Sequence, residues 1–218
     1  MPHARGKSGK GQKQQGAKAA RPDAASTVGS EKTGRPGALP YLSGLPIPDG
    51  EALPMRPIPI SPGPGEESVW AYPRPPRLEP VPVRLRVVLG GRTIADTVAG
   101  YRVLETSHPP TYYLPADDVA PDVLGPARRA GSCEWKGRAV LYDVAAGDRR
   151  AEGAAWAYPD PTPGFRAIAG HVAFYAGPME GCFVGEARAT PQPGGFYGGW
   201  ITPGIVGPFK GGPGSMGW

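Results

Sequence analysis

Glu105 and His108 head the part of the chain whose residue types suit acid–base chemistry. They lie three positions apart in "ETSHPP", shortly before the adjacent residues Tyr112 and Tyr113. A carboxylate, an imidazole and a phenol close together can accept and donate the protons of a bound substrate. A histidine in front of two prolines is, however, more often an ordinary loop residue. Glu105 and His108 are therefore candidate catalytic groups, and Lys136 is a third.

Lys136 and its neighbour Trp135 lie in the run "SCEWKG", which predicts part of a strand. Side chains alternate between the two faces of a strand, so Trp135 would share a face with Cys133, and Lys136 with Glu134. Trp135 would then form the wall of a pocket, and Lys136 would contact an anionic or carbonyl-bearing ligand. The alternative is that Trp135 belongs to the core and Lys136 pairs with a surface carboxylate, as exposed charges commonly do.

The phrase Trp-Ala-Tyr-Pro occurs twice, in "WAYPRPP" at residues 70–76 and in "WAYPDPTP" at residues 156–163. Proline keeps the preceding tyrosine extended, so the tryptophan two positions earlier lies on the same face. We expect both pairs to meet at one shared cavity that also receives Lys136. Its predicted ligand-binding walls are Trp70, Tyr72, Tyr112, Trp135, Trp156 and Tyr158. The alternative is that each pair anchors its own end of the sheet.

The sequence gives little support to a metal site, a thiol nucleophile or a phosphate-binding loop. Cys133, Cys182, His108 and His171 are not paired at the distances typical of zinc sites, so we expect no metal and no cofactor. Nothing in the sequence supplies Cys133 with a base or a lowered pKa, which a thiol nucleophile needs. Lys210 in "PFKGGPG" could meet a phosphate group together with glycine amides, but no strand–helix frame surrounds it.

The basic character of the chain belongs to its first residues. Of the 24 Lys and Arg residues, eight lie in residues 1–35 together with only two acidic residues, and the rest of the chain is close to neutral. Residues 1–36 contain no aromatic residue, so we predict a disordered basic tail that binds nucleic acid only weakly. No apolar run is long enough to span a membrane, and the N-terminus lacks an apolar signal region. With two cysteines, we expect a reduced, cytoplasmic protein.

The 34 glycines and 30 prolines of the chain gather on either side of a more regular body. Residues 37–66 hold a proline every few positions and predict a Pro-rich strap. Residues 67–190 form the expected domain. Residues 191–218 are rich in glycine yet carry Trp200, Phe209 and other large apolar side chains, which predicts an ordered arm on the body or on a second subunit.

Short strands are the elements that must position the candidate residues. Residues 83–97 alternate apolar and polar side chains around Gly90-Gly91, which predicts a β-hairpin. One or two helical turns are expected near residues 116–129 and one near residues 164–169. Further strands are expected at residues 100–107, 132–145, 170–177 and 182–189, and Gly137 allows a bend in the second of them. The pattern predicts a mainly β protein, a small barrel or folded sheet.

Three runs in this order resemble a bacterial family of unknown function, DUF427. They are "VLETSHPPTYYLPADDV", "CEWKGRAVLYDV" and "AAWAYPDPTPGFRAIAGHVAFYAG", and the resemblance covers about residues 84–176. It implies a small β-tent-like domain with sheets pinched around a central pocket, and it implies no particular reaction. Of the two repeated phrases, only the second falls inside the matched core.

We therefore expect a β domain that binds a small organic molecule in an aromatic pocket, with Glu105, His108 and Lys136 orienting it. The sequence leaves open whether the pocket also turns the ligand over. The alternative is a non-enzymatic assembly module whose aromatic residues are core. In that case the strap or the arm would dock on a partner or on a second copy of the chain.

Overall fold

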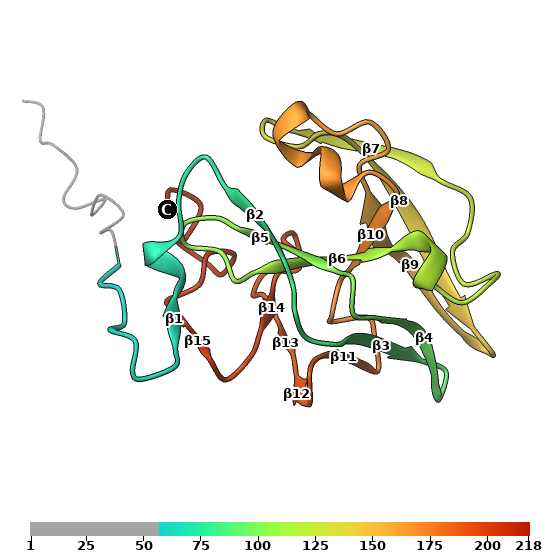
Figure 1. The fold of residues 1–218 in the computed structure, drawn as a ribbon, viewed down its shortest axis with the longest axis horizontal. Coiled ribbons are helices and arrows are strands. Elements are labelled where there is room, and N and C mark those ends of the chain that lie inside the picture. Colours follow the sequence, from blue (N-terminus) through green and yellow to red (C-terminus); the bar gives the residue numbers. More distant parts are fainter. Residues whose placement is uncertain (1–56) are drawn as a thin grey trace, which may run out of the picture. The chain divides into compact units, whose positions relative to one another are not determined.

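The computed structural model of the chain describes residues 57–218, and this part is mainly β, as predicted (Figure 1). The predicted disordered tail and residues 37–56 of the predicted strap lie outside the described residues. The helical elements within 57–218 are short 3₁₀ turns, η1 (Val69–Ala71), η2 (Ala116–Asp118) and η3 (Pro163–Ile168). None of these helices has the length and apolar character needed to cross a membrane.

A curled, seven-stranded antiparallel sheet forms a half-barrel and is the largest element of the fold (Figure 1). Its strands follow the order β2-β5-β6-β10-β9-β8-β7 across the sheet. Their bounds are β2 (Arg77–Pro80), β5 (Tyr101–Leu104), β6 (Thr111–Pro115), β10 (His171–Phe174), β9 (Arg149–Ala157), β8 (Gly137–Ala146) and β7 (Arg128–Cys133). The expected helical turns appear as η2 and η3, which follow β6 and β9 along the chain.

A second sheet of four strands contains the predicted hairpin. Its order is β12 (Ala187–Arg188), β11 (Gly181–Val184), β3 (Leu85–Leu89) and β4 (Arg92–Thr97). Gly90 and Gly91 join β3 to β4 with φ of 61° and 68°. A two-residue hairpin turn of this kind needs positive φ at both central positions, which explains why glycine occupies them.

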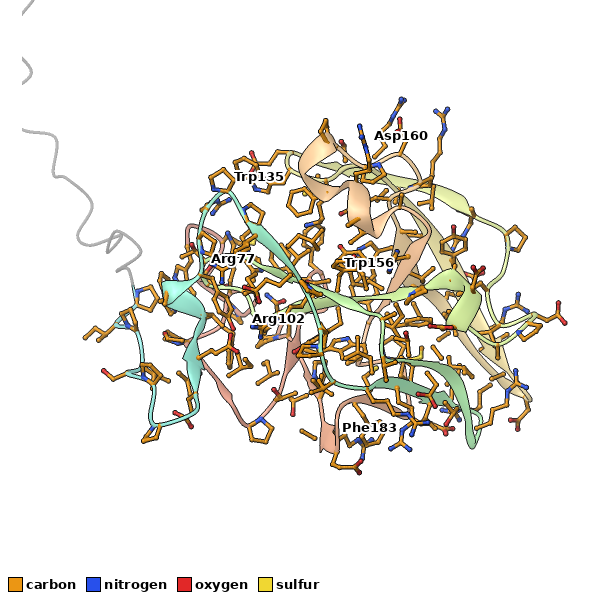
Figure 2. The ribbon with its side chains drawn as sticks, viewed as in Figure 1. Arg77, Arg102, Trp135, Trp156, Asp160 and Phe183 are labelled. Atoms are coloured by element: carbon orange, nitrogen blue, oxygen red, sulfur yellow. The ribbon has the colours of Figure 1, made fainter. Side chains whose placement is uncertain are left out.

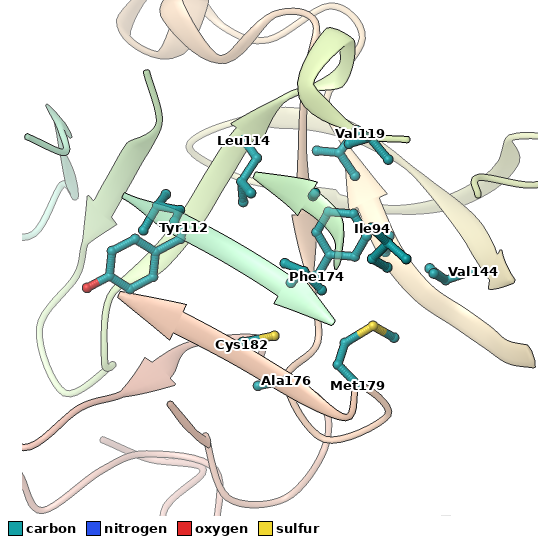
Figure 3. Packing of buried hydrophobic residues seen from close by; sticks show 14 of the residues in the cluster. Ile94, Tyr112, Leu114, Val119, Val144, Phe174, Ala176, Met179 and Cys182 are labelled. Carbon is teal, nitrogen blue, oxygen red and sulfur yellow. The ribbon is translucent and has the colours of Figure 1, made fainter. Parts of the chain in front are cut away.

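The two faces of the large sheet belong to different hydrophobic clusters. On β9, Ala155 and Ala157 pack into the main hydrophobic core, whereas Trp156 joins a separate aromatic cluster with Tyr158. The main core also takes side chains of both sheets, including Ile94, Leu114, Val144, Phe174 and Cys182 (Figure 3). Leu85 belongs to the same cluster. This core fixes the register of the strands, because a slip by one residue would exchange the two faces.

The first repeated phrase is not extended at its tryptophan, contrary to our expectation. Trp70 lies in the 3₁₀ turn η1, whose first turn is capped by Ser68 through a hydrogen bond from the Trp70 N–H at 3.4 Å. Tyr72 is extended (φ −71°, ψ 147°), as its position before Pro73 requires. Trp70 and Tyr72 therefore do not form one flat face. In the second phrase Trp156 lies on β9, as expected for an extended segment.

The run around Cys133 is a hairpin rather than the single strand we predicted. Strand β7 ends at Cys133 and β8 begins at Gly137, with Trp135 and Lys136 in the turn between them. Gly137 has φ +97°, a value that L-residues rarely adopt, and this reverses the chain. The predicted alternation of Glu134 and Lys136 on one strand face is therefore wrong.

The C-terminal segment is ordered and packs on the domain through Trp200. It contains β13 (Thr190–Pro191), β14 (Trp200–Ile201) and β15 (Ile205–Val206), and β15 pairs in parallel with β1 (Glu67–Ser68). The Trp200 side chain is fully buried in the main core, 5.1 Å from the Tyr112 ring, and its Nε1 donates to the Phe174 carbonyl at 2.8 Å.

Replacing Trp200 tests whether this segment stabilises the fold. Trp200→Ala should lower the free energy of unfolding by about 3–5 kcal/mol, because it removes a fully buried ring and leaves a cavity. Phe196→Ala is the matched control in the same segment, since that ring is 74% exposed. Urea unfolding of both variants checks this. Equal stability of the two variants would contradict the anchoring role of Trp200.

Candidate functional site

A cavity of about 610 Å³ opens beside the aromatic cluster on the large sheet. This cluster lies on the face of β6, β9 and β10 opposite the main core. The main aromatic residues of the wall are Tyr113, Trp135, Trp156, Tyr158, Tyr175 and Tyr197. Figure 2 shows Trp135 close to the tip of the β7–β8 hairpin and Trp156 in the middle of the domain. The cavity therefore extends from the sheet toward the hairpin tip.

Most of the predicted site residues line this cavity. They are Glu105, His108, Trp135, Lys136, Trp156 and Tyr158, contributed by three separate segments of the chain. Trp70, Tyr72 and Tyr112 do not line it. The prediction that the Trp and Tyr side chains of both repeated phrases line one cavity is therefore wrong for the first phrase.

Tyr112 is excluded by the alternation of side chains along β6. It packs in the main core beside Trp200, and burial raises its pKa to about 12. The next residue, Tyr113, points to the other face of the sheet and lines the cavity. Two adjacent tyrosines on a strand cannot both face one pocket, and the sequence did not reveal which of them would.

Trp70 and Tyr72 anchor the flanking segments instead of forming cavity walls. Trp70 Nε1 donates to the Pro208 carbonyl at 2.8 Å, and its ring lies 5.9 Å from that of Trp218. The Tyr72 hydroxyl donates to Glu67 at 2.9 Å. One residue of the first phrase, Arg74, does line the cavity, although we did not predict it as a site residue from the sequence.

The second phrase builds the centre of the wall and holds the adjacent turn. The ring centroids of Trp156 and Tyr158 each lie 6.4 Å from that of Tyr113. Further along the phrase, the Thr162 hydroxyl donates to the Trp135 carbonyl, and the Thr162 N–H donates to the Lys136 carbonyl at 3.2 Å. The segment from Trp156 to Thr162 thus supplies two side chains of the cavity wall, Trp156 and Tyr158, and fixes the turn that carries Trp135 and Lys136.

The C-terminal segment closes the cavity over Trp156. A Cβ atom at Gly198 would clash with the Trp156 ring, so only glycine allows this close approach of the backbone. Tyr197 packs edge-on against His108, with ring centroids 4.5 Å apart. The Tyr175 hydroxyl donates to the Phe196 carbonyl at 3.3 Å. Tyr175 was missed although it lies in the third run that resembles the family, whereas Tyr197 lies outside the matched range, where no motif could indicate it.

The buried side chain of Gln192 determines the state of His108. Its Oε1 accepts from the Gly199 N–H at 3.1 Å, and its Nε2 donates to the Lys210 carbonyl at 2.8 Å, which fixes the orientation of the amide. The same Nε2 lies 3.0 Å from His108 Nδ1. Because an amide nitrogen can only donate, Nδ1 must accept, and the proton of the neutral ring resides on Nε2.

The positive charges around His108 also favour its neutral form. Burial, followed by the nearby charges of Lys210, Arg74 and Lys136 in that order, lowers the pKa of His108 to about 4. Burial also raises the pKa of Tyr113 and, together with the nearby Cys133, that of Tyr158. At neutral pH the histidine is therefore uncharged, and both phenols keep their protons. The wall offers hydrogen-bond donors rather than a strong general base.

The cations of the cavity differ in how they are partnered. The Arg74 guanidinium lies 3.6 Å from carboxylate oxygens of both Glu105 and Glu134. Lys210 donates to the main-chain oxygen of Trp218 at 2.7 Å. Lys136 is only 9% exposed, and within residues 57–218 its Nζ has neither a hydrogen-bond acceptor nor an ion-pair partner. It lies over the rings of Tyr158 and Phe165 at 5.7 and 5.9 Å.

The two cysteines have different surroundings and neither is in a disulfide. Cys133 lines the cavity, whereas Cys182 belongs to the main core, where burial raises its pKa. Across residues 57–218, no three His, Cys, Asp or Glu side chains are grouped so that they could hold a metal ion.

A profile of the family described as a domain of unknown function, DUF427, matches residues 77–185, half of the chain. The chain belongs to this family. The match contains the three runs that carried the resemblance in the sequence and extends a few residues beyond the expected range. No curated protein matches the chain. Within the cavity wall of this DUF427 protein, Arg74, Gln192, Tyr197 and Lys210 lie outside the matched range.

The pH dependence of stability tests the assignment of a neutral His108. Its pKa is about 4 in the folded protein against 6.5 in the reference state, so the unfolded chain binds more protons between these values. The resulting stability is complete above pH 6.5 and is lost as the pH falls toward 4. Between those limits the loss should be about 2 kcal/mol, because some solvent screening remains.

His108→Asn provides the matched control, because the Asn oxygen can accept from Gln192 but does not titrate. Urea unfolding of both proteins at a series of pH values isolates the histidine contribution as a difference in slope. If the two proteins lose stability in parallel between pH 6.5 and 4, His108 is not held neutral.

Proposed function

We propose that the DUF427 domain of this protein binds a small planar organic molecule in its aromatic cavity, in the bacterial cytoplasm. The observation that carries the proposal is the cavity wall itself. About 610 Å³ of space is surrounded by seven aromatic side chains, the six named above and Phe196, together with polar and charged groups. Pockets for small organic ligands typically enclose roughly 300–1,000 Å³ and combine an apolar lining with few polar contacts.

The aromatic rings support a flat ligand in particular. Trp156 packs against Tyr175 at a centroid distance of 4.5 Å, and both Trp156 and Tyr158 pack against Tyr113. Rings held by one another in this way lose little further entropy when a ligand stacks on them. Trp135, in the β7–β8 turn, provides a wall outside the sheet.

The polar groups favour binding and orientation over a particular reaction. His108 is neutral with its Nδ1 already occupied by Gln192, and Glu105 is engaged by Arg74. Neither group is arranged as a free base with an adjacent nucleophile. We therefore propose ligand binding as the function. Two predictions from the sequence are untested: that the pocket also turns its ligand over, and that the domain is instead an assembly module.

A neutral aromatic fluorophore with a flat naphthalene ring, N-phenyl-1-naphthylamine, tests this function directly. The folded protein should bind one equivalent with an increase in probe fluorescence. Trp135→Ala should weaken binding about tenfold, because an aromatic residue at the centre of a contact often contributes this much.

Trp70→Ala is the matched control, because it removes the same side chain outside the cavity wall. Its affinity for the probe should change by less than about twofold. Thermal melts of both variants establish that they are folded. If the probe does not bind, or if folded Trp70→Ala loses binding as Trp135→Ala does, the cavity is not the binding site.

A further inference from the structure

The unpartnered groups of the cavity wall are hydrogen-bond donors. Lys136 Nζ, nine-tenths buried as a residue, has no partner among residues 57–218. In the same part of the chain, the buried Trp135 Nε1 and Tyr113 hydroxyl also lack one. His108 adds its Nε2–H, since Nδ1 is taken by Gln192. A buried donor without an acceptor is costly, which favours an acceptor brought by the ligand, and the Lys136 ammonium in the same cavity wall would add a charge to that contact.

The positive charge of the wall exceeds its negative charge. Arg74, Lys136 and Lys210 line the cavity with Glu105 and Glu134, and both carboxylates lie against Arg74. All three cations act on His108, whose pKa is lowered by burial and then by each of them, and the pKa of Lys210 is lowered by burial and then by Arg74. Lys136 is left without a carboxylate among the described residues.

We propose that the cavity selects planar ligands that carry an anionic oxygen group, a carboxylate or a phosphate, and that Lys136 binds this group. The proposal rests on the proposed function and names the ligand class for the same site. The ring of the ligand lies between the aromatic walls, and its anionic group replaces the acceptor that Lys136 lacks. A charge-assisted hydrogen bond in such a shielded place is stronger than a neutral one.

Two of the three cations come from outside the family domain. The DUF427 match covers residues 77–185, whereas Arg74 precedes it and Lys210 follows it. The turn at His108 joins these flanks, because the Ser107 N–H donates to the Val69 carbonyl at 3.0 Å and the Lys210 N–H donates to the Ser107 carbonyl at 2.9 Å. The flanking segments therefore increase the positive charge of a pocket whose main walls belong to the family domain.

A matched series of naphthalene compounds tests the ligand class by isothermal titration calorimetry. The series consists of 2-naphthoate, 2-naphthyl phosphate and the neutral methyl 2-naphthoate. At least one anion should bind about tenfold more tightly than the ester, which corresponds to one charge-assisted hydrogen bond. The stronger of the two anions identifies the carboxylate or the phosphate as the preferred group.

Lys136→Met should remove the preference for the anion and leave the affinity of the ester within about twofold. Arg86→Met is the matched control, since Arg86 lies over the Phe183 ring outside the cavity wall and its replacement removes the same charge. If Lys136→Met is unfolded, Lys136→Gln and the salt dependence of the wild-type affinities replace it. The affinity of the anion should fall with added salt, and that of the ester should not.

These experiments distinguish a failure of the proposed anion site from a failure of the proposed ligand-binding function. Equal binding of the ester and the anions, or an anion preference that survives in the folded Lys136 variant, overturns the proposed anion site and leaves planar-ligand binding intact. Failure of the whole series and of the neutral fluorophore overturns both. Unchanged anion affinity in Arg74→Met and Lys210→Met would show that the flanking segments add no selectivity.

Discussion

The side-chain amide of Gln192 is the interaction on which the candidate site depends. It is only 4% exposed, and it links the Gly199 N–H, the Lys210 carbonyl and the ring of His108. Each of these polar groups would otherwise be left without its partner in a shielded place, which costs free energy of folding. The amide therefore joins the C-terminal segment to the His108 turn and sets the tautomer of the histidine. Gln192 thus fixes both where His108 lies in the cavity wall and which of its ring nitrogens carries the proton.

The cavity lies against the face of the large sheet that carries Tyr113, Trp156 and Tyr158, opposite the main core. Ala155 and Ala157 allow the main core to pack closely against β9, while Trp156 and Tyr158 project to the opposite side. The flanking segments then cover this face, with the Gly198 backbone against the Trp156 ring.

Much of this arrangement could be predicted from local sequence signals. The Gly90-Gly91 hairpin, the mainly β fold and the family followed from turn residues, alternation and motifs in order. The hairpin around Trp135 was missed, because a positive φ at Gly137 cannot be distinguished in the sequence from a bend within a strand. The choice of Tyr113 over Tyr112 depends on strand register, which long-range packing decides. Arg74, Gln192 and Tyr197 reach the cavity only through contacts between segments far apart in the chain, so no local pattern identifies them.

In the proposed site, the aromatic cavity holds a planar ring with its anionic group at Lys136. A crystal structure with 6-bromo-2-naphthoate, using the anomalous signal of bromine, tests this arrangement most directly. We expect a bromine peak inside the cavity, the naphthalene ring between the aromatic walls, and a carboxylate oxygen within hydrogen-bond distance of Lys136 Nζ. A bromine peak only outside the cavity, or a bound ring whose carboxylate faces solvent away from Lys136, would contradict it.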